Sequence, residues 1–319
     1  MGDLLFVELL GGFGDLLLAL PAVHALSLAG HRVHVLTFDP GGELLDGDPL
    51  VASWSTTSDH SDGAPRRAVE RALAARHYDR AVTTTTYDGI GDLLRAAVPD
   101  TVTDLWRRPP ADELVDRRFL RLLAADGWVR PEHAALPPRV LARPDRDAPE
   151  VLLLPDAGMA VKRWSGWPEL VARLDGLDVA ALAGPSGTAA EDTGARVLPA
   201  RSLRELASLA AGVAERGGVV VGADTGPVRL AAAAGARTVG LFGPTLAARY
   251  GQRPEQGHVG LQGLPGCAVR QPTAITEQEC WWSGACPLTG GPPACTDDLA
   301  PARVAGVVLD LVEADRLSA

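Results

Sequence analysis

Lysine, asparagine and isoleucine are scarce or missing in this 319-residue sequence. Lys162 is the only lysine among 30 Lys and Arg residues, asparagine is absent, and Ile90 and Ile275 are the only isoleucines. These residues have AT-rich codons, so their scarcity indicates a GC-rich bacterial genome. It also singles out Lys162, because arginine, which differs from lysine in geometry and hydration, stands at every other basic position.

Long apolar runs are missing too. No stretch approaches the ~20 apolar residues that cross a bilayer. The N-terminus, Met-Gly-Asp-Leu-Leu, lacks the basic segment of a signal peptide. We therefore expect a cytoplasmic protein with no transmembrane segment, for which peripheral membrane contact stays open.

An excess of basic residues is also missing. The sequence has 30 Lys and Arg and 40 Asp and Glu, which gives a net charge of −10. Nucleic-acid-binding proteins usually carry a basic stripe, so we expect no nucleic-acid partner. The 46% hydrophobic and 22% charged residues are typical of a globular protein. The length suits about two domains.

Short apolar runs alternate with segments of helical periodicity, which predicts parallel α/β sheets. In the first half we expect strands at 4–9, 33–38 and 80–85 and helices at 15–28 and 66–76. The second half repeats the pattern, with strands at 151–154, 179–183, 219–222 and 238–242 and helices at 168–174, 203–215 and 227–234. This predicts two doubly wound, Rossmann-like domains facing across a cleft, with ligands at the carboxyl ends of the strands.

A polar, proline-bearing segment at 142–150 has the composition of a linker. It separates a predicted N-terminal domain at 1–145 from a C-terminal domain at 151–300. Residues 301–319 are predicted to form a final helix, whose apolar face could pack back on the N-terminal domain. The stretch 252–295 is rich in Gly, Pro and Trp, and we expect little regular structure there.

The first predicted strand ends in a glycine-rich turn that leads into a helix. Gly12 and Gly14 form a G-x-G, and Asp39 follows the second strand at about the distance of a ribose-binding acid. Leu17 occupies the third glycine position of that dinucleotide fingerprint, so the match is incomplete. Asp15 beside the turn is either a helix-capping residue or a general base at a cleft.

Lys162 and Arg163 follow the predicted strand 151–154 and precede a helix. Cations together with exposed backbone N–H groups suit a diphosphate. The alternative is a solvated basic pair.

Asp224, Thr225 and Gly226 lie between a predicted strand and the helix that Pro227 opens. The free N–H groups of that helix start favour an anion. The alternative for Asp224 is an ordinary N-cap residue.

Acidic pairs and cysteines are the remaining candidates for a metal site. Two D-x-D strings could hold a divalent ion beside a diphosphate, although solvated loop acids are the commoner reading: Asp46 with Asp48, and Asp145 with Asp147. Free packed thiols, structural zinc and disulfides are all open for the four cysteines, and the lack of a C-x-x-C pair argues against zinc: Cys267, Cys280, Cys286 and Cys295. No catalytic metal is predicted.

Together, these motifs resemble glycosyltransferase family 9, the ADP-heptose:lipopolysaccharide heptosyltransferases. The resemblance spans both halves and rests on the order and spacing of four blocks. These are Gly14-Asp15 followed by Pro21-Ala22, Lys162-Arg163-Trp164, Asp224-Thr225-Gly226-Pro227 with Leu230-Ala231-Ala232-Ala233, and Leu241-Phe242-Gly243-Pro244-Thr245.

The resemblance implies a GT-B fold, with the acceptor bound by the N-terminal domain and the nucleotide sugar by the C-terminal domain. It implies inverting transfer without metal or cofactor, from a donor such as ADP-heptose to a hydroxyl of a glycan or small molecule. By position, Asp15 is the implied base, and Gly12 and Gly14 shape its loop. The implied donor contacts are Lys162, Arg163, Glu191, Asp224, Thr225, Gly226 and Arg229.

Two features depart from the family. Arg229 stands where many members have histidine, which implies a different sugar or phosphate contact. Many GC-rich bacteria lack lipopolysaccharide, so the acceptor could be a cell-envelope glycan or a natural-product scaffold. Two other functions stay open: an NAD(P)-dependent oxidoreductase using Gly12, Gly14 and Asp39, and a non-catalytic nucleotide-sugar-binding protein, which would need no base at Asp15.

Overall fold

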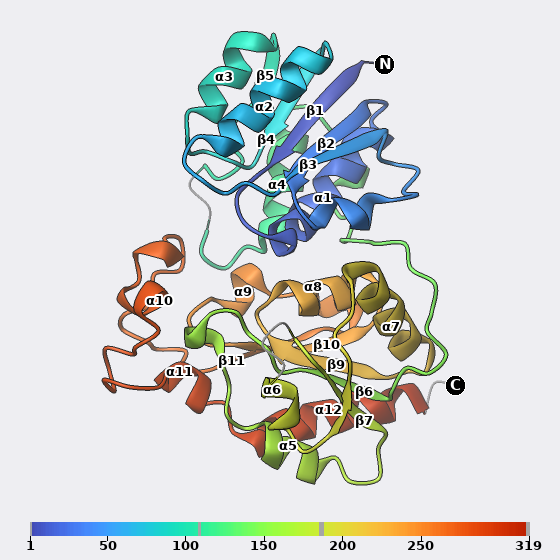
Figure 1. The fold of residues 1–319 in the computed structure, drawn as a ribbon, viewed down its shortest axis with the longest axis vertical. Coiled ribbons are helices and arrows are strands. Elements are labelled where there is room, and N and C mark those ends of the chain that lie inside the picture. The colour runs from blue at the N-terminus through green and yellow to red at the C-terminus, as the bar shows by residue number, and fades with distance from the viewer. Residues whose placement is uncertain (1, 108–109, 185–187, 317–319) are drawn as a thin grey trace. The chain divides into compact units, whose positions relative to one another are not determined.

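The computed structural model describes residues 2–107, 110–184 and 188–316, apart from the side chains of Thr188 and Asp315. It contains two compact units, the first formed by residues 1–109 and 115–141 and the second by residues 110–114 and 142–319. Residues 110–114, which the sequence analysis placed in the N-terminal domain, group with the second unit. In each unit, helices cover a central sheet (Figure 1).

The first unit contains a parallel five-stranded sheet in the order β3-β2-β1-β4-β5. Its strands are β1 (Asp3–Glu8), β2 (Arg32–Phe38), β3 (Ser53–Thr57), β4 (Arg80–Thr83) and β5 (Asp100–Val102). In the centre of the sheet, Leu5 of β1 lies opposite His34 and Ala81. A strand covered on both faces reads as an almost continuous apolar run, which is why the sequence revealed β1.

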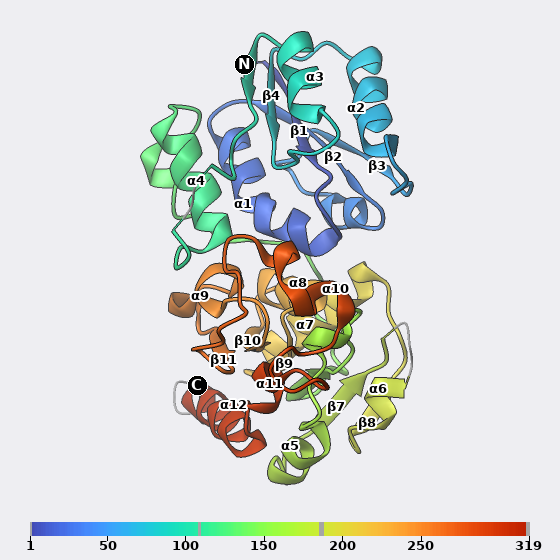
Figure 2. The ribbon, with the colours of Figure 1, turned by 90° about the vertical axis from the view of Figure 1, so that its left-hand side faces the viewer.

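Helices lie on both faces of this first sheet. α1 (Phe13–Leu28) and α4 (Val115–Ala125) cover one face, and α2 (Ala64–Ala75) and α3 (Ile90–Ala97) cover the other (Figure 2). Residues 16–26 of α1 are all buried, so this helix is apolar all round rather than amphipathic. Short 3-10 turns occupy Gly41–Leu45 and Pro131–His133.

The second unit contains a parallel six-stranded sheet in the order β11-β10-β9-β6-β7-β8. Its strands are β6 (Val151–Leu154), β7 (Val179–Leu182), β8 (Arg196–Leu198), β9 (Val219–Ala223), β10 (Arg237–Phe242) and β11 (Val259–Gln262). The helices are α5 (Trp167–Arg173), α6 (Thr188–Glu191), α7 (Leu203–Glu215), α8 (Gly226–Ala233), α9 (Ala247–Tyr250), α10 (Glu279–Ser283), α11 (Ala294–Asp297) and α12 (Pro301–Arg316). Short 3-10 turns occupy Ala160–Lys162, Pro254–Gln256 and Ile275–Glu277.

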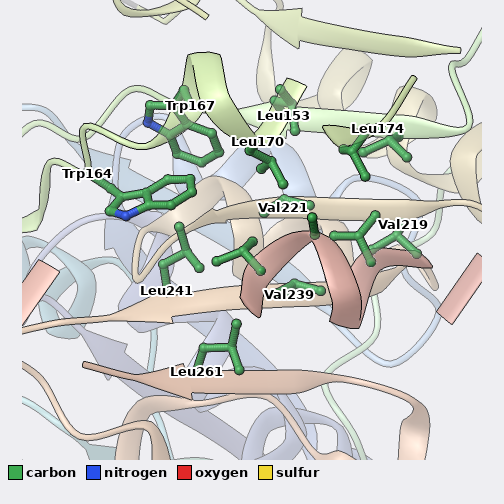
Figure 3. Packing of buried hydrophobic residues seen from close by; sticks show 14 of the residues in the cluster. Leu153, Trp164, Trp167, Leu170, Leu174, Val219, Val221, Val239, Leu241 and Leu261 are labelled. Atoms are coloured by element: carbon green, nitrogen blue, oxygen red, sulfur yellow. The ribbon is translucent and has the colours of Figure 1, made fainter. Parts of the chain in front are cut away.

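Helices α7 and α8 pack on one face of the second sheet, while α5 and α12 pack on the other (Figure 1). α7 begins at a capping box, in which Ser202 and Glu205 satisfy each other's backbone N–H groups. On the α5 side, Trp164 and Trp167 meet edge to face with ring centres 4.8 Å apart. These rings and the strand residues Leu153, Val221 and Leu241 form one buried cluster (Figure 3).

The last helix belongs to the second unit. Val304, Val308 and Val312 of α12 are buried in the same cluster as the core residues of β9 and β10. The apolar face that was expected to pack on the N-terminal domain thus contributes to the core of the second unit. Its valines recur every four residues and form an apolar stripe, which the apolar face of the second sheet covers.

Several short elements were not predicted. β3 reads Ser-Trp-Ser-Thr-Thr and lies at a sheet edge, and β11 lies inside the stretch expected to be irregular. Such short edge strands have weak patterns of their own, because their neighbours supply the backbone hydrogen bonds that hold them. Among the described residues, no helix is both long and apolar enough to cross a membrane.

The strand orders decide where ligands can bind. In the first unit, successive strands are added outward from β1 on one side and from β4 on the other, so the strand order reverses between β1 and β4. In the second unit it reverses between β6 and β9 in the same way. Loops that leave the carboxyl ends of such a strand pair diverge to opposite faces and leave a crevice, which is the usual ligand site of these sheets.

Candidate active site

Lys162 and Asp224 come together at the crevice of the second unit. Lys162 follows β6, and Asp224 follows β9, the neighbouring strand. The Lys162 ammonium donates to the backbone oxygen of Asp224 at 2.7 Å and to its Oδ2 at 3.2 Å. The same ammonium lies 5.2 Å from the ring centre of Trp281 in α10. The solvated basic pair considered for this position therefore does not describe Lys162.

Asp224 is 4% exposed and fully engaged. Arg229 donates to its Oδ1, and Thr245 Oγ1 donates to its Oδ2 at 2.7 Å. Burial raises the pKa of this carboxyl, but the charges of Lys162 and Arg229 and the hydrogen bonds from Thr245 and Lys162 outweigh it. The net pKa lies below its ordinary value, so Asp224 is a carboxylate at neutral pH.

The start of α8 lies beside this cluster. Thr225 is the N-cap residue, and its side chain makes no capping hydrogen bond; its Oγ1 donates to the Ala223 oxygen at 3.3 Å instead. Gly226 and Pro227 form the first turn, so Asp224 is not the N-cap that the sequence left open. A helix start with backbone N–H groups and a net positive cluster beside it is suited to an anion.

Arg163 and Glu191 lie apart from that cluster. Arg163 is exposed, donates to the Ala157 oxygen at 3.3 Å, and lines a pocket of about 340 Å³ at the ends of β6 and β7. Among the described residues, Asp156 and Asp192 line the same pocket and Glu191 does not, although Glu191 and Asp192 are both exposed. The donor contact expected for Glu191 stays a prediction.

Asp15 of the first unit lies in the opening turn of α1, at the carboxyl end of β1. Gly12 is the N-cap residue, so Asp15 does not cap the helix. A Cβ at position 12 would meet nothing within 4 Å, but a Cβ at position 11 would collide with Asp15 Oδ2. The glycine that makes room for the Asp15 carboxylate is therefore Gly11, which the sequence analysis did not single out.

The loop before Asp15 is fixed by its neighbours. Leu9 N donates to Thr85 Oγ1 at 2.8 Å, and the Tyr87 hydroxyl donates to the Leu9 oxygen. Both partners follow β4, the strand across the crevice from β1. Burial, with the charges of Glu8 and Asp88, raises the pKa of Tyr87 to about 12, so the phenol stays a donor at physiological pH.

Glu8 is a fully buried carboxyl at the end of β1. Its Oε1 accepts from Leu10 N at 3.0 Å, and its Oε2 accepts from Thr37 Oγ1 at 3.4 Å. Burial and the charge of Asp15 raise the pKa of Glu8 well above its ordinary value, and the two hydrogen bonds do not offset them. A charged residue inside an apolar strand run was the signal that could have revealed Glu8.

Asp48 and Asp145 of the two D-x-D strings make hydrogen bonds within the fold. Asp48 is 6% exposed and accepts from His24 at 2.8 Å and from Leu50 N at 2.9 Å, so its interpretation as a solvated acid is wrong. Asp145 Oδ1 accepts from the backbone N–H of Asp147 at 3.0 Å, which stabilises the turn at 145–147.

The four cysteines are described and none forms a disulfide. Cys280 and Cys295 each interact electrostatically with Cys267, which places these thiols in one region. Burial raises the pKa of Cys295 to about 11. Within the described ranges, no three His, Cys, Asp or Glu side chains are arranged to hold a metal ion, so the thiol positions give the zinc interpretation no support.

Two parallel α/β units with polar side chains gathered at their crevices define a protein of the GT-B type. Residues 130–262 match the family model described as glycosyltransferase family 9 (heptosyltransferase). This match confirms the resemblance that the motifs indicated, and it confirms the expected enzyme class, a glycosyltransferase. It gives no support to the oxidoreductase alternative, and Asp39 is exposed.

Solved structures of similar fold cover nearly the whole chain. ADP-heptose lps heptosyltransferase II of E. coli is 17% identical with a TM-score of 0.70, over 98% of this chain and 99% of that one. E. coli heptosyltransferase WaaC with ADP is 17% identical with a TM-score of 0.66, over 97% and 99%. The iron-containing dodecameric glycosyltransferase TibC of enterotoxigenic E. coli H10407 is 19% identical with a TM-score of 0.62, over 98% and 79%. No curated protein matches in sequence.

Proposed function

We propose that this protein is an inverting glycosyltransferase that moves a sugar from a nucleoside-diphosphate donor to a hydroxyl of a glycan or small molecule. The observation that carries the proposal is the cluster of Lys162, Asp224 and Arg229 beside the start of α8. A departing diphosphate gains negative charge, and fixed cations and N–H dipoles stabilise such charge in the transition state.

The charges of this cluster favour a diphosphate. One carboxylate against two cations leaves a net charge of +1 at a crevice that is closed to most solvent. An ammonium has three N–H donors, and Asp224 takes two of those of Lys162. The third can bind a phosphate oxygen, and the N–H groups of Thr225 and Gly226 can bind others.

The pocket beside Arg163 suits the nucleoside of the donor. It lies at the carboxyl ends of β6 and β7, and its walls include Trp167 and the carboxylates of Asp156 and Asp192. Apolar walls suit a base, and carboxylates accept hydrogen bonds from ribose hydroxyls. We assign the ribose contact to Asp192 in place of Glu191.

The donor sugar is proposed by analogy. Similar structures are described as heptosyltransferases with ADP and with ADP-2-deoxy-2-fluoro heptose, which supports an ADP-linked heptose. Arg229 stands where many family members have histidine, and its guanidinium donates to Asp224 Oδ1. We propose that it affects the sugar or phosphate indirectly, by orienting the Asp224 carboxylate.

Asp15 is proposed as the base. Its carboxylate takes the proton of the acceptor hydroxyl while the oxygen bonds to the anomeric carbon, and the sugar–diphosphate bond breaks with its electrons leaving on the diphosphate. A single displacement of this kind inverts the anomeric centre and needs one base. The anchoring of Leu9 by Thr85 and Tyr87 holds the loop of Asp15 in place beforehand.

Metal independence and location are part of the proposal. The positive charge that a catalytic metal would otherwise supply comes from Lys162, Arg229 and the N–H groups at the start of α8. We propose action in the bacterial cytoplasm, where nucleotide sugars are made, with peripheral membrane contact if the acceptor is lipid-linked.

A nucleotide screen followed by a transfer assay tests the proposal. We expect ADP and ADP-heptose to raise the melting temperature more than UDP, GDP or NADH, and we expect Lys162→Ala to lose most of that shift. Asp310→Asn, an exposed change in α12, is the matched control. Stabilisation by NADH alone would favour the oxidoreductase.

The transfer assay uses the nucleotide sugar that stabilises best, with a panel of hydroxylated acceptors and excess EDTA. We expect turnover to persist with the chelator. Complete loss that magnesium or manganese restores would overturn metal independence. Tight donor binding with neither transfer nor donor hydrolysis would favour the non-catalytic binding protein.

A further inference from the structure

A second pocket, of about 300 Å³, lies in the first unit at the carboxyl ends of β1, β2 and β4. We call it the Phe38 pocket, and it is lined by Leu10, Phe38, His60, Ser61, Asp62, Gly63, Pro65, Tyr87 and Asp88. Leu10 belongs to the loop that leads to Asp15, and Tyr87 holds that loop through the Leu9 oxygen. The loop that leads to the proposed base therefore forms part of the pocket wall through Leu10.

The walls of the Phe38 pocket include an aromatic surface that suits a sugar ring. His60 stacks on buried Phe38, with ring centres 4.0 Å apart and an interplanar angle of 23°. Leu10 and Tyr87 remain 36% and 40% exposed, although both are large apolar side chains. Exposed rings and apolar atoms that converge on a hollow are typical of ligand sites, and a volume near the lower end of such sites suits one ring.

The charge of the Phe38 pocket is negative. Asp62 and Asp88 are its only lining carboxylates, and neither has a hydrogen-bond or ion-pair partner for its side chain among the described residues. In the part of the chain that the structure describes, no lysine or arginine lines this pocket.

Two arginines of α2 approach the rim but do not neutralise it. Arg66 donates to the backbone oxygens of Asp88 and Gly89, and its charge is paired with Glu70 at 3.1 Å. Arg67 donates to the backbone oxygen of Asp62, and its charge is paired with Asp59 at 3.8 Å. The two pocket carboxylates are left without a counter-ion of their own.

We propose that the Phe38 pocket binds the acceptor, and that it selects a hydroxylated ring carrying a positive charge, such as an amino sugar or an aminocyclitol, over an anionic sugar. The inference rests on the proposed transferase function. The ring packs on His60 and Tyr87, its ammonium pairs with Asp62 and Asp88, and one of its hydroxyls is directed to Asp15.

Direct binding to the full-length protein without donor tests this proposal. Saturation-transfer NMR compares glucosamine, N-acetylglucosamine and glucuronate, which are cationic, neutral and anionic rings of similar shape. We expect glucosamine to bind most tightly and glucuronate least. We expect 0.5 M NaCl to weaken the binding of glucosamine and to leave the binding of N-acetylglucosamine almost unchanged, because salt screens exposed charges.

Three variants separate the charges from the aromatic surface. Asp62→Asn and Asp88→Asn should each lower the affinity for glucosamine about two- to fivefold, the scale of an exposed ion pair. Neither should lower the affinity for N-acetylglucosamine. Asparagine keeps the size of Asp88 and tolerates its φ of 60°. His60→Ala should weaken all three sugars alike, and Asp310→Asn should change none.

Several results would overturn the proposal. They are tighter binding of glucuronate than of glucosamine, equal effects of Asp62→Asn and Asp310→Asn on glucosamine, and no binding of any of the three sugars. None of these outcomes touches the nucleotide screen, which probes the second unit. A failure of the acceptor proposal is therefore distinguishable from a failure of the transferase proposal.

Discussion

Replacing Gly11 with alanine should displace the proposed base without harming the fold. A Cβ at position 11 would lie 3.3 Å from Asp15 Cγ and well inside contact distance of Oδ2. Restoring an ordinary separation requires the carboxylate to move by about 1 Å. Gly11 does not adopt a left-handed φ, so alanine costs no backbone strain. The carboxylate is the far end of a short side chain, so rotation about the side-chain bonds of Asp15 can shift it.

The expected magnitude follows from that displacement. Misplacing a reacting group by about 1 Å costs on the order of 10²-fold in rate, which corresponds to about 2.7 kcal/mol of transition-state stabilisation. The melting temperature should stay the same or rise slightly, because alanine lowers the entropy of the unfolded chain. Donor binding should not change, since the donor cluster belongs to the second unit.

The assay compares steady-state turnover, melting temperature and donor affinity for Gly11→Ala and Gly12→Ala. Gly12 is the matched control, because a Cβ there meets nothing within 4 Å. We expect a large loss of turnover in the first variant and little change in the second. Equal turnover in the two variants, both well folded, would refute the reasoning that Gly11 sets the position of Asp15.

Three further predictions concern single side chains. Asp15→Asn should lower turnover by roughly 10²–10⁴-fold with donor affinity retained, and near-normal turnover in kinetic assays would exclude it as the base. Lys162→Ala should weaken donor binding in calorimetry by about 10–100-fold, the scale of a charge-assisted hydrogen bond, and by more than Lys162→Arg; unchanged affinity would reject its role. Glu8→Gln should stabilise the protein increasingly as pH rises. The folded-state pKa of Glu8 is raised, so its favourable contribution is complete below the unfolded pKa and is lost as pH rises toward the folded one. Melting curves from pH 4 to 9 that show a constant difference between Glu8→Gln and the native protein would contradict this.

The sequence by itself determined the α/β class, the two similar halves and most central elements. β1, β6, β9 and β10 are buried on both faces, so they had to be apolar runs bounded by turns, and the helices between them show their periodicity directly. The lone lysine and the order of the motif blocks marked Lys162, Asp224 and Asp15. A strand, the turn after it and the helix start that follows are consecutive in the chain, so they can be read from spacing.

Only the tertiary structure decided which of these residues meet. Lys162 and Asp224 are 62 positions apart, and they touch because β6 and β9 are neighbours in the sheet. The same holds for Leu9 and Tyr87 across β1 and β4. The space over Gly11 and the pocket that Asp192 lines depend on packing and on the exact turn of a helix. A linear pattern carries no information about those, because each is set by side chains from distant segments.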